Sequence, residues 1–295
     1  LSEGRQISVG VSTGIATLDR NTGGYPIGSV SAILGATGHG KSTLLGNGAR
    51  ASAGGGDLAL VYSFEDPSKF WAQRALAQES GVPTETIVRR TDLETKGGVA
   101  VLRKIIAGLS TKRSEVIVPS SQWSADDVIR DVQSRRARDV ATHGRKRKCS
   151  VWVDYVQVMR LEIQRNGNRE QGIAHAMDRM SWLAQGCGSS DRADECAVVA
   201  ASQVKQKVID EKRAPRIDDG ADSFAIAKVC KFMVGINRPS KYDTNADSKQ
   251  GRIDVLKRNQ GDDEVFADVE LDLATHSIRE RKPSHREPPP YWGDR

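Results

Sequence analysis

Short apolar runs alternate along this chain with longer stretches in which apolar and polar residues mix. The apolar runs cover residues 29–35, 58–64, 115–120, 150–159, 196–203 and 229–236. Several are almost continuously apolar, which is typical of strands covered on both faces. The mixed stretches after residue 42, at 67–80, at 125–139 and at about 170–185 indicate helices. Pro67 suits the first turn of one, and Ser124 is a good N-cap for another. This alternation predicts an α/β fold with a mostly parallel central sheet and helices on both faces.

The last part of the chain has a different pattern. "GRIDVLKRN" and "EVFADVELDLATHSI" indicate strands with little helix between them, so we expect an antiparallel edge on the sheet. Residues 1–24 form a Gly-rich N-terminal arm or linker in this interpretation. Residues 25–280 form the main domain, and residues 281–295 form a basic, Pro-rich tail.

Composition narrows the class of protein only moderately. The 295 residues carry a formal net charge of +6, which favours a polyanionic partner, although a basic surface without any partner is an equal alternative. No apolar run is long enough for a transmembrane helix, and the start has no signal-peptide core, so we expect a cytoplasmic protein without a membrane partner. The four cysteines lack CxxC spacing, which favours free thiols over disulfides or zinc.

The stretch "GATGHGKS" matches the phosphate-binding pattern GxxxxGK[ST] and lies between a predicted strand and a predicted helix. Its glycines let backbone N–H groups surround phosphate oxygens at a helix N-terminus. Lys41 would neutralise the β- and γ-phosphates of ATP, and Ser42 would bind Mg²⁺. The predicted ATP-binding residues here are Gly35, Ala36, Thr37, Gly38, His39, Gly40, Lys41, Ser42 and Thr43.

Polar residues at the ends of other strands supply the remaining chemistry. Asp154 lies in an apolar strand and would hold Mg²⁺ through water; alternatively it is a buried carboxylate satisfied by backbone donors. Glu65 ends another strand and is the predicted general base, while Asp66 could instead cap the next helix. Gln203 ends a third strand, where it either senses the γ-phosphate or caps the strand.

At this point the chain resembles the ATPase domain of DnaB-type replicative helicases over roughly residues 8–280. "VSTGIATLDRNTGGYPIGSVSAILGATGHGKSTLL", "YSFED", "VDYVQVM" and "AASQ" occur in the family's order. The resemblance implies a RecA-like P-loop NTPase core that assembles as a hexameric ring, binds ATP and Mg²⁺, and encircles single-stranded DNA. It also implies a catalytic role for Glu65, metal association for Asp154, a sensor role for Gln203, and nucleotide contact by Arg74.

The family's trans-acting finger, a cation supplied by the neighbouring subunit, corresponds to the strand "IDVLKRNQG". Family members usually have Lys, one residue, then Arg, whereas here Lys257 and Arg258 are adjacent. Which of the two would reach the γ-phosphate therefore stays open. Taken alone, the pair could also be exposed cations on an edge strand.

Two loops correspond to the family's DNA-binding loops. The first, "LEIQRNGNREQG", follows the Asp154 strand, and the second, "KRAPRIDDGADSFA", departs from the family's Arg-Glu-Ser-Gly pattern. Backbone N–H contacts to phosphates would survive that change. The predicted DNA-binding residues are Arg165, Asn168, Arg169, Arg213, Arg216, Gly220, Ala221, Asp222 and Ser223. The basic run at 143–149 precedes the Asp154 strand, so we interpret it as a solvated loop at the opposite edge.

These inferences predict an ATP-dependent, ring-forming DNA helicase that translocates on single-stranded DNA in replication, in a bacterial cytosol or a phage-infected cell. A primase or a loader would be a further partner. The alternative is a RecA/RadA-like or KaiC-like DNA-binding ATPase without unwinding activity. A non-catalytic adaptor is disfavoured, because Lys41, Ser42, Glu65 and Asp154 are all present.

Overall fold

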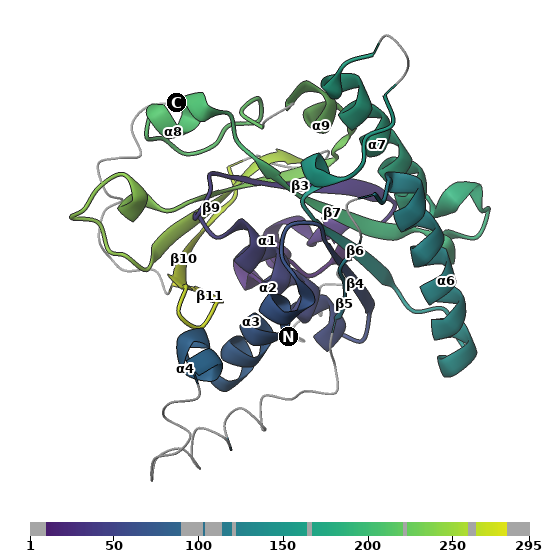
Figure 1. Cartoon of the computed structure of the whole chain (residues 1–295), viewed down its shortest axis with the longest axis horizontal. Coiled ribbons are helices and arrows are strands. Elements are labelled where there is room, and N and C mark those ends of the chain that lie inside the picture. Colours follow the sequence, from purple (N-terminus) through teal and green to yellow (C-terminus); the bar gives the residue numbers. More distant parts are fainter. Residues whose placement is uncertain are drawn as a thin grey trace, which may run out of the picture.

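The structure is a computed structural model and describes residues 10–89, 103, 114–119, 122–163, 167–220, 223–258 and 264–281. Within these residues a nine-stranded sheet has the order β11-β10-β9-β8-β3-β7-β6-β4-β5 (Figure 1). The strands are β3 (Ser29–Gly35), β4 (Leu58–Ser63), β5 (Glu115–Ile117), β6 (Cys149–Asp154), β7 (Cys196–Gln203), β8 (Phe232–Asn237), β9 (Gln250–Arg258), β10 (Phe266–Asp272) and β11 (Ser277–Glu280). The strands from β8 to β5 are parallel, and β9, β10 and β11 add an antiparallel edge. The predicted fold class is confirmed.

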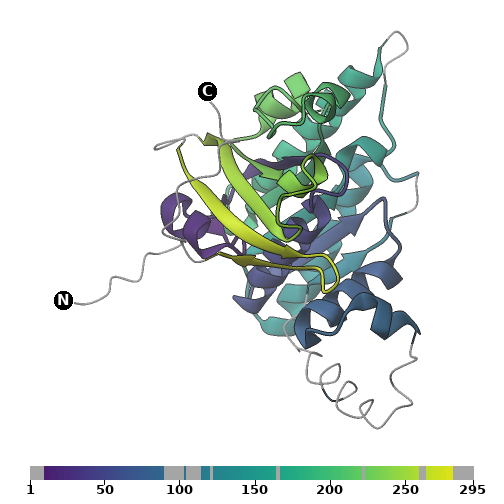
Figure 2. The ribbon, with the colours of Figure 1, turned by 90° about the vertical axis from the view of Figure 1, so that its left-hand side faces the viewer.

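Helices cover both faces of the sheet, and each face has its own apolar core. The helices are α1 (Ala16–Thr22), α2 (Lys41–Gly54), α3 (Ser68–Ser80), α4 (Thr84–Arg89), α6 (Ala125–His143), α7 (Arg169–Ala184), α8 (Gln206–Asp210) and α9 (Ser223–Val229), with short 3-10 turns η2 (Val156–Val158), η3 (Gly186–Gly188), η4 (Arg192–Asp194) and η5 (Pro239–Lys241). Helices α6 and α7 cover one face, and α2 covers the other, where β11 also contacts it and β10 contacts α1 (Figure 2). Alternate residues of one strand serve the two cores: Val151 and Val153 belong to one, Trp152 to the other.

Most predicted elements are present, with shifts at their ends. Helix α6 begins after Ser124, whose backbone N–H donates to the Asp127 carboxylate over 2.8 Å, as a capping box requires. The strand predicted at 150–159 ends at Asp154, because pairing with β7 stops at Val153 and the chain turns into η2. The run at 115–120 forms a strand only to Ile117, and in the run at 229–236 the strand begins at Phe232.

The segment that the sequence suggested as an arm contributes to the domain core from residue 10 onward. The short strand β1 (Gly10–Val11) pairs with β2 (Tyr25–Pro26), and α1 follows. Val11, Ile15 and Leu18 are buried in the same cluster as Tyr25. Residues 10–24 therefore pack as part of the folded unit. None of the described helices has the length and apolar character needed to cross a bilayer.

The sheet topology determines where chemistry can occur. In parallel strands the carboxyl ends lie at one edge, so the loops after β3, β4, β6 and β7 meet there. The register makes this concrete, since Gly35 lies opposite Gln203 and Ser63 lies opposite Asp154.

Candidate nucleotide-binding site and the loops around it

The loop between β3 and α2 has the backbone of a phosphate-binding loop. Gly38 and Gly40 have φ values of 78° and 97°, which side-chain-bearing residues rarely adopt. A Cβ on Gly40 would also lie 2.6 Å from Leu271 Cδ2 of β10. Glycine is therefore required on both conformational and steric grounds. Because α2 begins at Lys41, its first N–H groups have no partner within the helix and lie next to this loop.

Lys41 is buried and lies within this loop. Its Nζ donates to the Ala36 carbonyl oxygen over 3.0 Å. Burial lowers the pKa of the Lys41 ammonium, while the negative charges of Asp154 and Glu65 act in the opposite direction. Lys41 thus lies in the electrostatic field of Glu65, the predicted general base, and of Asp154, the predicted metal-associated carboxylate. Ser42 and Thr43 follow in the first turn of α2.

Asp154, the last residue of β6, is suited to a bound cation. It is 1% exposed, and burial raises the pKa of its carboxyl to about 6, although a hydrogen bond from Ser42 partly opposes that shift. Its Oδ2 is buried without a hydrogen-bond partner among the described residues. A buried carboxylate oxygen in this state is costly unless a cation or its water shell satisfies it. Asp154 and the Ser42 hydroxyl therefore fit an Mg²⁺ held partly by phosphates and water.

Glu65 and Arg74 lie close to Asp154. The Phe64 backbone N–H donates to the Asp154 carbonyl oxygen over 2.8 Å, which places the exposed Glu65 beside the end of β6. Arg74 of α3 forms a 2.7 Å ion pair with Asp66, and its charge also acts on Asp154. Glu65, the predicted base, and Arg74, the predicted nucleotide-contacting cation, thus both lie near Asp154. Asp66 does not cap α3, because the N-cap is Pro67 and no side chain caps that helix; its carboxylate pairs with Arg74 instead.

Gln203 ends β7 beside the first glycine of the loop, since it pairs with Gly35 in the parallel register. A residue that the sequence interpretation left without a role, Gln157 of η2, reinforces this position. Its Nε2 donates to the hydroxyl of Ser202, the neighbour of Gln203, over 2.9 Å. The motif "DYVQ" was the available signal for Gln157, and its role is to tie the end of β6 to the end of β7.

Lys257 and Arg258 are the last two residues of β9, at the sheet edge opposite to the one that carries the phosphate-binding loop. They pair with Met233 and Phe232 at the amino end of β8, which lie about 10 and 13 Å along the strand direction from the position beside Gly35. Adjacent strand residues point to opposite faces. Accordingly, Lys257 Nζ donates to the Ala227 carbonyl oxygen over 2.6 Å, whereas Arg258 Nη1 donates to the Asn21 carbonyl oxygen over 2.9 Å. Both cations are separated from the chain's own phosphate-binding loop.

The first predicted DNA loop joins η2 to α7. Arg165 lies outside the described residues. Asn168 is the N-cap of α7: its side chain accepts from the Gln171 N–H over 2.9 Å. Arg169 donates to the Gln157 carbonyl oxygen over 2.8 Å. The structure therefore gives Asn168 and Arg169 local roles in shaping the loop.

The second predicted DNA loop, residues 212–225, belongs to the connection between β7 and α9, which is described over residues 204–220 and is held together by Asp219. This buried carboxylate binds the Arg213 guanidinium, with one contact of 2.8 Å, and accepts from the Arg216 N–H over 2.6 Å. The carboxylate raises the pKa of Arg213. Arg216 is exposed, Gly220 bridges to Val204, and Ser223 begins α9. Ala221 and Asp222 lie outside the described residues.

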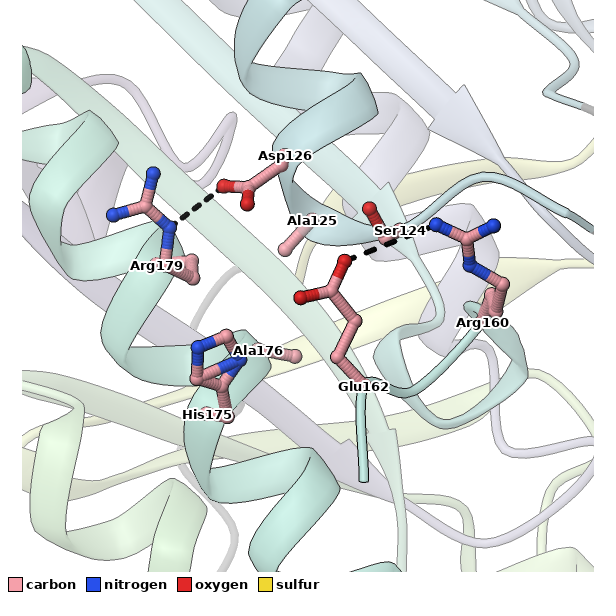
Figure 3. A pocket seen from close by; sticks show the side chains of 8 residues that line it. All are labelled: Ser124, Ala125, Asp126, Arg160, Glu162, His175, Ala176 and Arg179. Atoms are coloured by element: carbon pink, nitrogen blue, oxygen red, sulfur yellow. Dashed lines mark hydrogen bonds and ion pairs between the residues drawn. The ribbon is translucent and has the colours of Figure 1, made fainter. Parts of the chain in front are cut away.

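A small polar pocket lies between α6, α7 and the start of the first DNA loop (Figure 3). Its charges pair with one another: Arg179 Nε donates to Asp126 over 2.6 Å, and Arg160 lies 3.8 Å from Glu162. None of the predicted nucleotide-binding residues lines it. The ion pairs around it connect two helices and a loop, and the pocket is separate from the nucleotide site.

Two cations of the basic run at 143–149 pair with neighbouring carboxylates. Arg147 pairs with Asp139, and Lys146 pairs with Asp191 and Asp194 over 2.7 Å each. These ion pairs join the end of α6 to the loop before β7, at the edge opposite the nucleotide site.

Comparison with known proteins gives a consistent result. The model of the DnaB-like helicase C terminal domain matches residues 10–276. The ATPase domain of G40P superposes with a TM-score of 0.80 at 17% identity, over 95% of this chain and 94% of that one. A DnaB-like replicative helicase, described with its interactions with primase, also gives a TM-score of 0.80 at 17% identity, over 94% of this chain.

This chain spans 62% of the length of that second helicase. No curated protein sequence is significantly similar to it. At this level of identity the two structures establish the fold, whereas the family model covers nearly the whole chain. The chain belongs to the DnaB-like helicase C-terminal domain family, and it is an ATP-hydrolysing domain of that family.

Proposed function

We propose that this ATPase is the motor of a closed ring that moves along single-stranded DNA, and that each of its active sites is completed by a neighbouring copy. The observation that carries the proposal is the separation of the cations from the phosphate loop. Lys41, Ser42, Glu65 and Asp154 surround one edge of the sheet. A cation for the γ-phosphate would then come from Lys257 or Arg258 of the adjacent subunit.

Each residue would contribute a distinct part of hydrolysis. Lys41 and the loop N–H groups bind the phosphates, and Glu65, which is exposed to solvent, orients and deprotonates the attacking water. Gln203 reports the γ-phosphate to the loop that follows it, and Arg74 adds positive charge. Bound Mg²⁺ would neutralise developing charge on the phosphates, held by Ser42 directly and by Asp154 through water.

The DNA would be contacted by the loops after β6 and β7. Contacts from backbone N–H groups and from cations such as Arg216 read no base sequence, so translocation would be sequence-independent. Primase is included among the candidate partners, because one similar helicase has been described with its interactions with primase.

Mixed rings test the shared active site. Lys41→Ala removes the phosphate lysine and keeps the finger cations, whereas Lys257→Ala/Arg258→Ala does the reverse. Each variant alone should lose ATPase activity by about 10³-fold or more. When the two are mixed at random in equal amounts, about a quarter of the interfaces combine an intact loop with an intact finger, so up to that share of wild-type activity should return.

Three further results bear on this proposal. A mixture no more active than its separate components would show that the site is complete within one chain. Fork-unwinding assays address the helicase function: wild type should separate strands with ATP and Lys41→Ala should not. Wild type that hydrolyses ATP on DNA but never separates strands would contradict the motor role. Closed rings with nucleotide, seen by electron microscopy, separate it from a filament-forming recombinase.

A further inference from the structure

The segment between β8 and β9 lies directly on the phosphate-binding loop. The Arg238 backbone N–H donates to His39 Nδ1 over 3.2 Å, and the His39 ring centroid lies 5.2 Å from that of Tyr242. Lys241 Nζ lies 3.1 Å from the place where a Cβ on Gly38 would be. This segment therefore contacts two successive residues at the tip of the phosphate loop.

His39 is well suited to a fixed contact with this segment. His39 is 2% exposed, and its Nδ1 accepts a hydrogen bond, so the ring proton resides on Nε2. Burial, together with the charges of Lys41, Lys241 and Arg238, lowers the pKa of His39 to about 4. The ring is thus neutral at physiological pH. It can pack against the Tyr242 ring without an unpaired buried charge.

On its other side, Tyr242 contacts the second DNA loop. Its hydroxyl donates to the Arg213 carbonyl oxygen over 3.3 Å. Arg213 in turn is bound to Asp219, whose own carbonyl oxygen accepts from the Lys205 N–H over 2.8 Å. The loop from Lys205 to Asp219 is therefore a single hydrogen-bonded unit, and Tyr242 is attached to it at one point.

We propose that Tyr242 is a positioning residue that couples the phosphate loop, through His39, to the loop at 204–220. The inference rests on the proposed function, in which that loop contacts DNA. A triphosphate that binds the N–H groups of this loop would shift the backbone around His39, because His39 lies within the loop. A tyrosine ring has few internal degrees of freedom, so a shift at its His39 face moves its hydroxyl and hence Arg213. The link is independent of Gln203, which reaches the same loop from β7.

The test is Tyr242→Phe, which keeps the ring contact with His39 and deletes the hydroxyl. ATPase rates are measured without DNA and with saturating oligo-dT. The rate without DNA should stay within about twofold of wild type, while the DNA-stimulation factor should fall about fivefold, the worth of one hydrogen bond. By linkage, a non-hydrolysable ATP analogue should strengthen oligo-dT binding less in the variant, by the same factor.

Tyr62→Phe is the matched control. It also removes a tyrosine hydroxyl with a hydrogen bond, 2.8 Å to Asp131, but lies on the α6 face away from both loops. It should leave the DNA-stimulation factor unchanged. Full DNA stimulation in Tyr242→Phe, or an equal fall in both ATPase rates, would overturn the inference. Wild type without any DNA stimulation would instead overturn the proposed DNA function, and the inference with it.

A double-mutant cycle gives a second readout. Asp219→Asn weakens the anchor of Arg213 without touching the nucleotide site. If Tyr242 acts through that anchor, the double variant should lose little more stimulation than the more affected single variant. Losses that multiply independently would show that the two residues do not act in one chain of contacts.

Discussion

Burial favours the protonated form of the Asp154 carboxyl, whereas association with Mg²⁺ needs the ionised form. Its pKa rises from 3.8 to about 6 because burial disfavours the ionised form. The protonated form is therefore favoured in the folded state, so this group costs stability at pH values above 6. The cost is lost as the pH falls through 6 towards 3.8, where both folded and unfolded chains are protonated. At about 1.4 kcal/mol per tenfold change in proton affinity, the full cost is about 3 kcal/mol.

We therefore expect Asp154→Asn to stabilise the nucleotide-free protein at pH 8, by up to about 3 kcal/mol, while abolishing ATP hydrolysis. The stabilisation should be smaller at pH 5, where the wild-type carboxylate is already partly protonated. Urea unfolding of both proteins at the two pH values measures it. A variant that is equally or less stable than wild type at pH 8 would show that Asp154 carries no electrostatic cost.

At the scale of elements, the packing of α2 against β6 decides how the phosphate loop is supported. Gly48 lies in the middle of α2, and a Cβ there would be 2.6 Å from Cη2 of Trp152. Trp152 is fully buried and in edge-to-face contact with Tyr25, 5.5 Å between centroids, so it cannot move aside. Gly54, at the end of the same helix, has no atom within 4 Å of its Cβ position.

Substituting these two glycines by alanine should change the stability of the protein in opposite directions. Gly48→Ala should destabilise the protein by about 1–3 kcal/mol through overpacking, although alanine favours helix. Gly54→Ala should stabilise it by about 0.5–1 kcal/mol through helix propensity alone. Thermal and urea unfolding measure both. If Gly48→Ala were as stable as Gly54→Ala, the close approach of α2 to β6 would be refuted.

Much of this arrangement was predictable from local patterns in the sequence. The glycines and Lys41 identify the loop at the end of β3, and continuous apolar runs identify the buried parallel strands that place Asp154 at the same edge. The end of β6 was not predictable, because "YVQVM" continues the apolar pattern although its backbone leaves the ladder. The burial of Leu18 in the core was missed for a related reason. A short helix among glycines has too few apolar positions to show a period.

Contacts between distant segments were also beyond the sequence. His39 and Tyr242 are far apart in the chain, and nothing in the local pattern of either residue indicates the other. Likewise, Arg213 and Arg169 appeared as cations available for DNA. Arg213 is committed to Asp219, and Arg169 donates to a backbone carbonyl. Sequence composition counts such cations, but only the fold shows which of them are already paired.

At the scale of the whole molecule, DNA affinity could depend on the total net charge of +6 or on the positions of particular cations. Arg216 is exposed on the loop at the nucleotide edge. Arg192, whose side chain is 91% exposed, lies before β7 at the opposite edge and 3.5 Å from Glu195. Substituting either residue by alanine removes the same single charge. Any difference between the two variants therefore reports placement, since the total charge is equal.

We expect Arg216→Ala to weaken oligo-dT binding for all base sequences and to reduce the slope of log affinity against log salt by about 0.7, the release expected for one single-strand phosphate contact. Arg192→Ala should change neither quantity beyond a factor of about two, because its charge is distant from the loops and already paired. Fluorescence anisotropy with a non-hydrolysable ATP analogue, across a salt series, measures both variants under one condition. Equal losses in the two variants would mean that DNA is held by the general positive field of the protein. A loss confined to Arg216→Ala would locate the DNA at the edge where the phosphate loop lies, which is what a motor needs if nucleotide turnover is to move the strand.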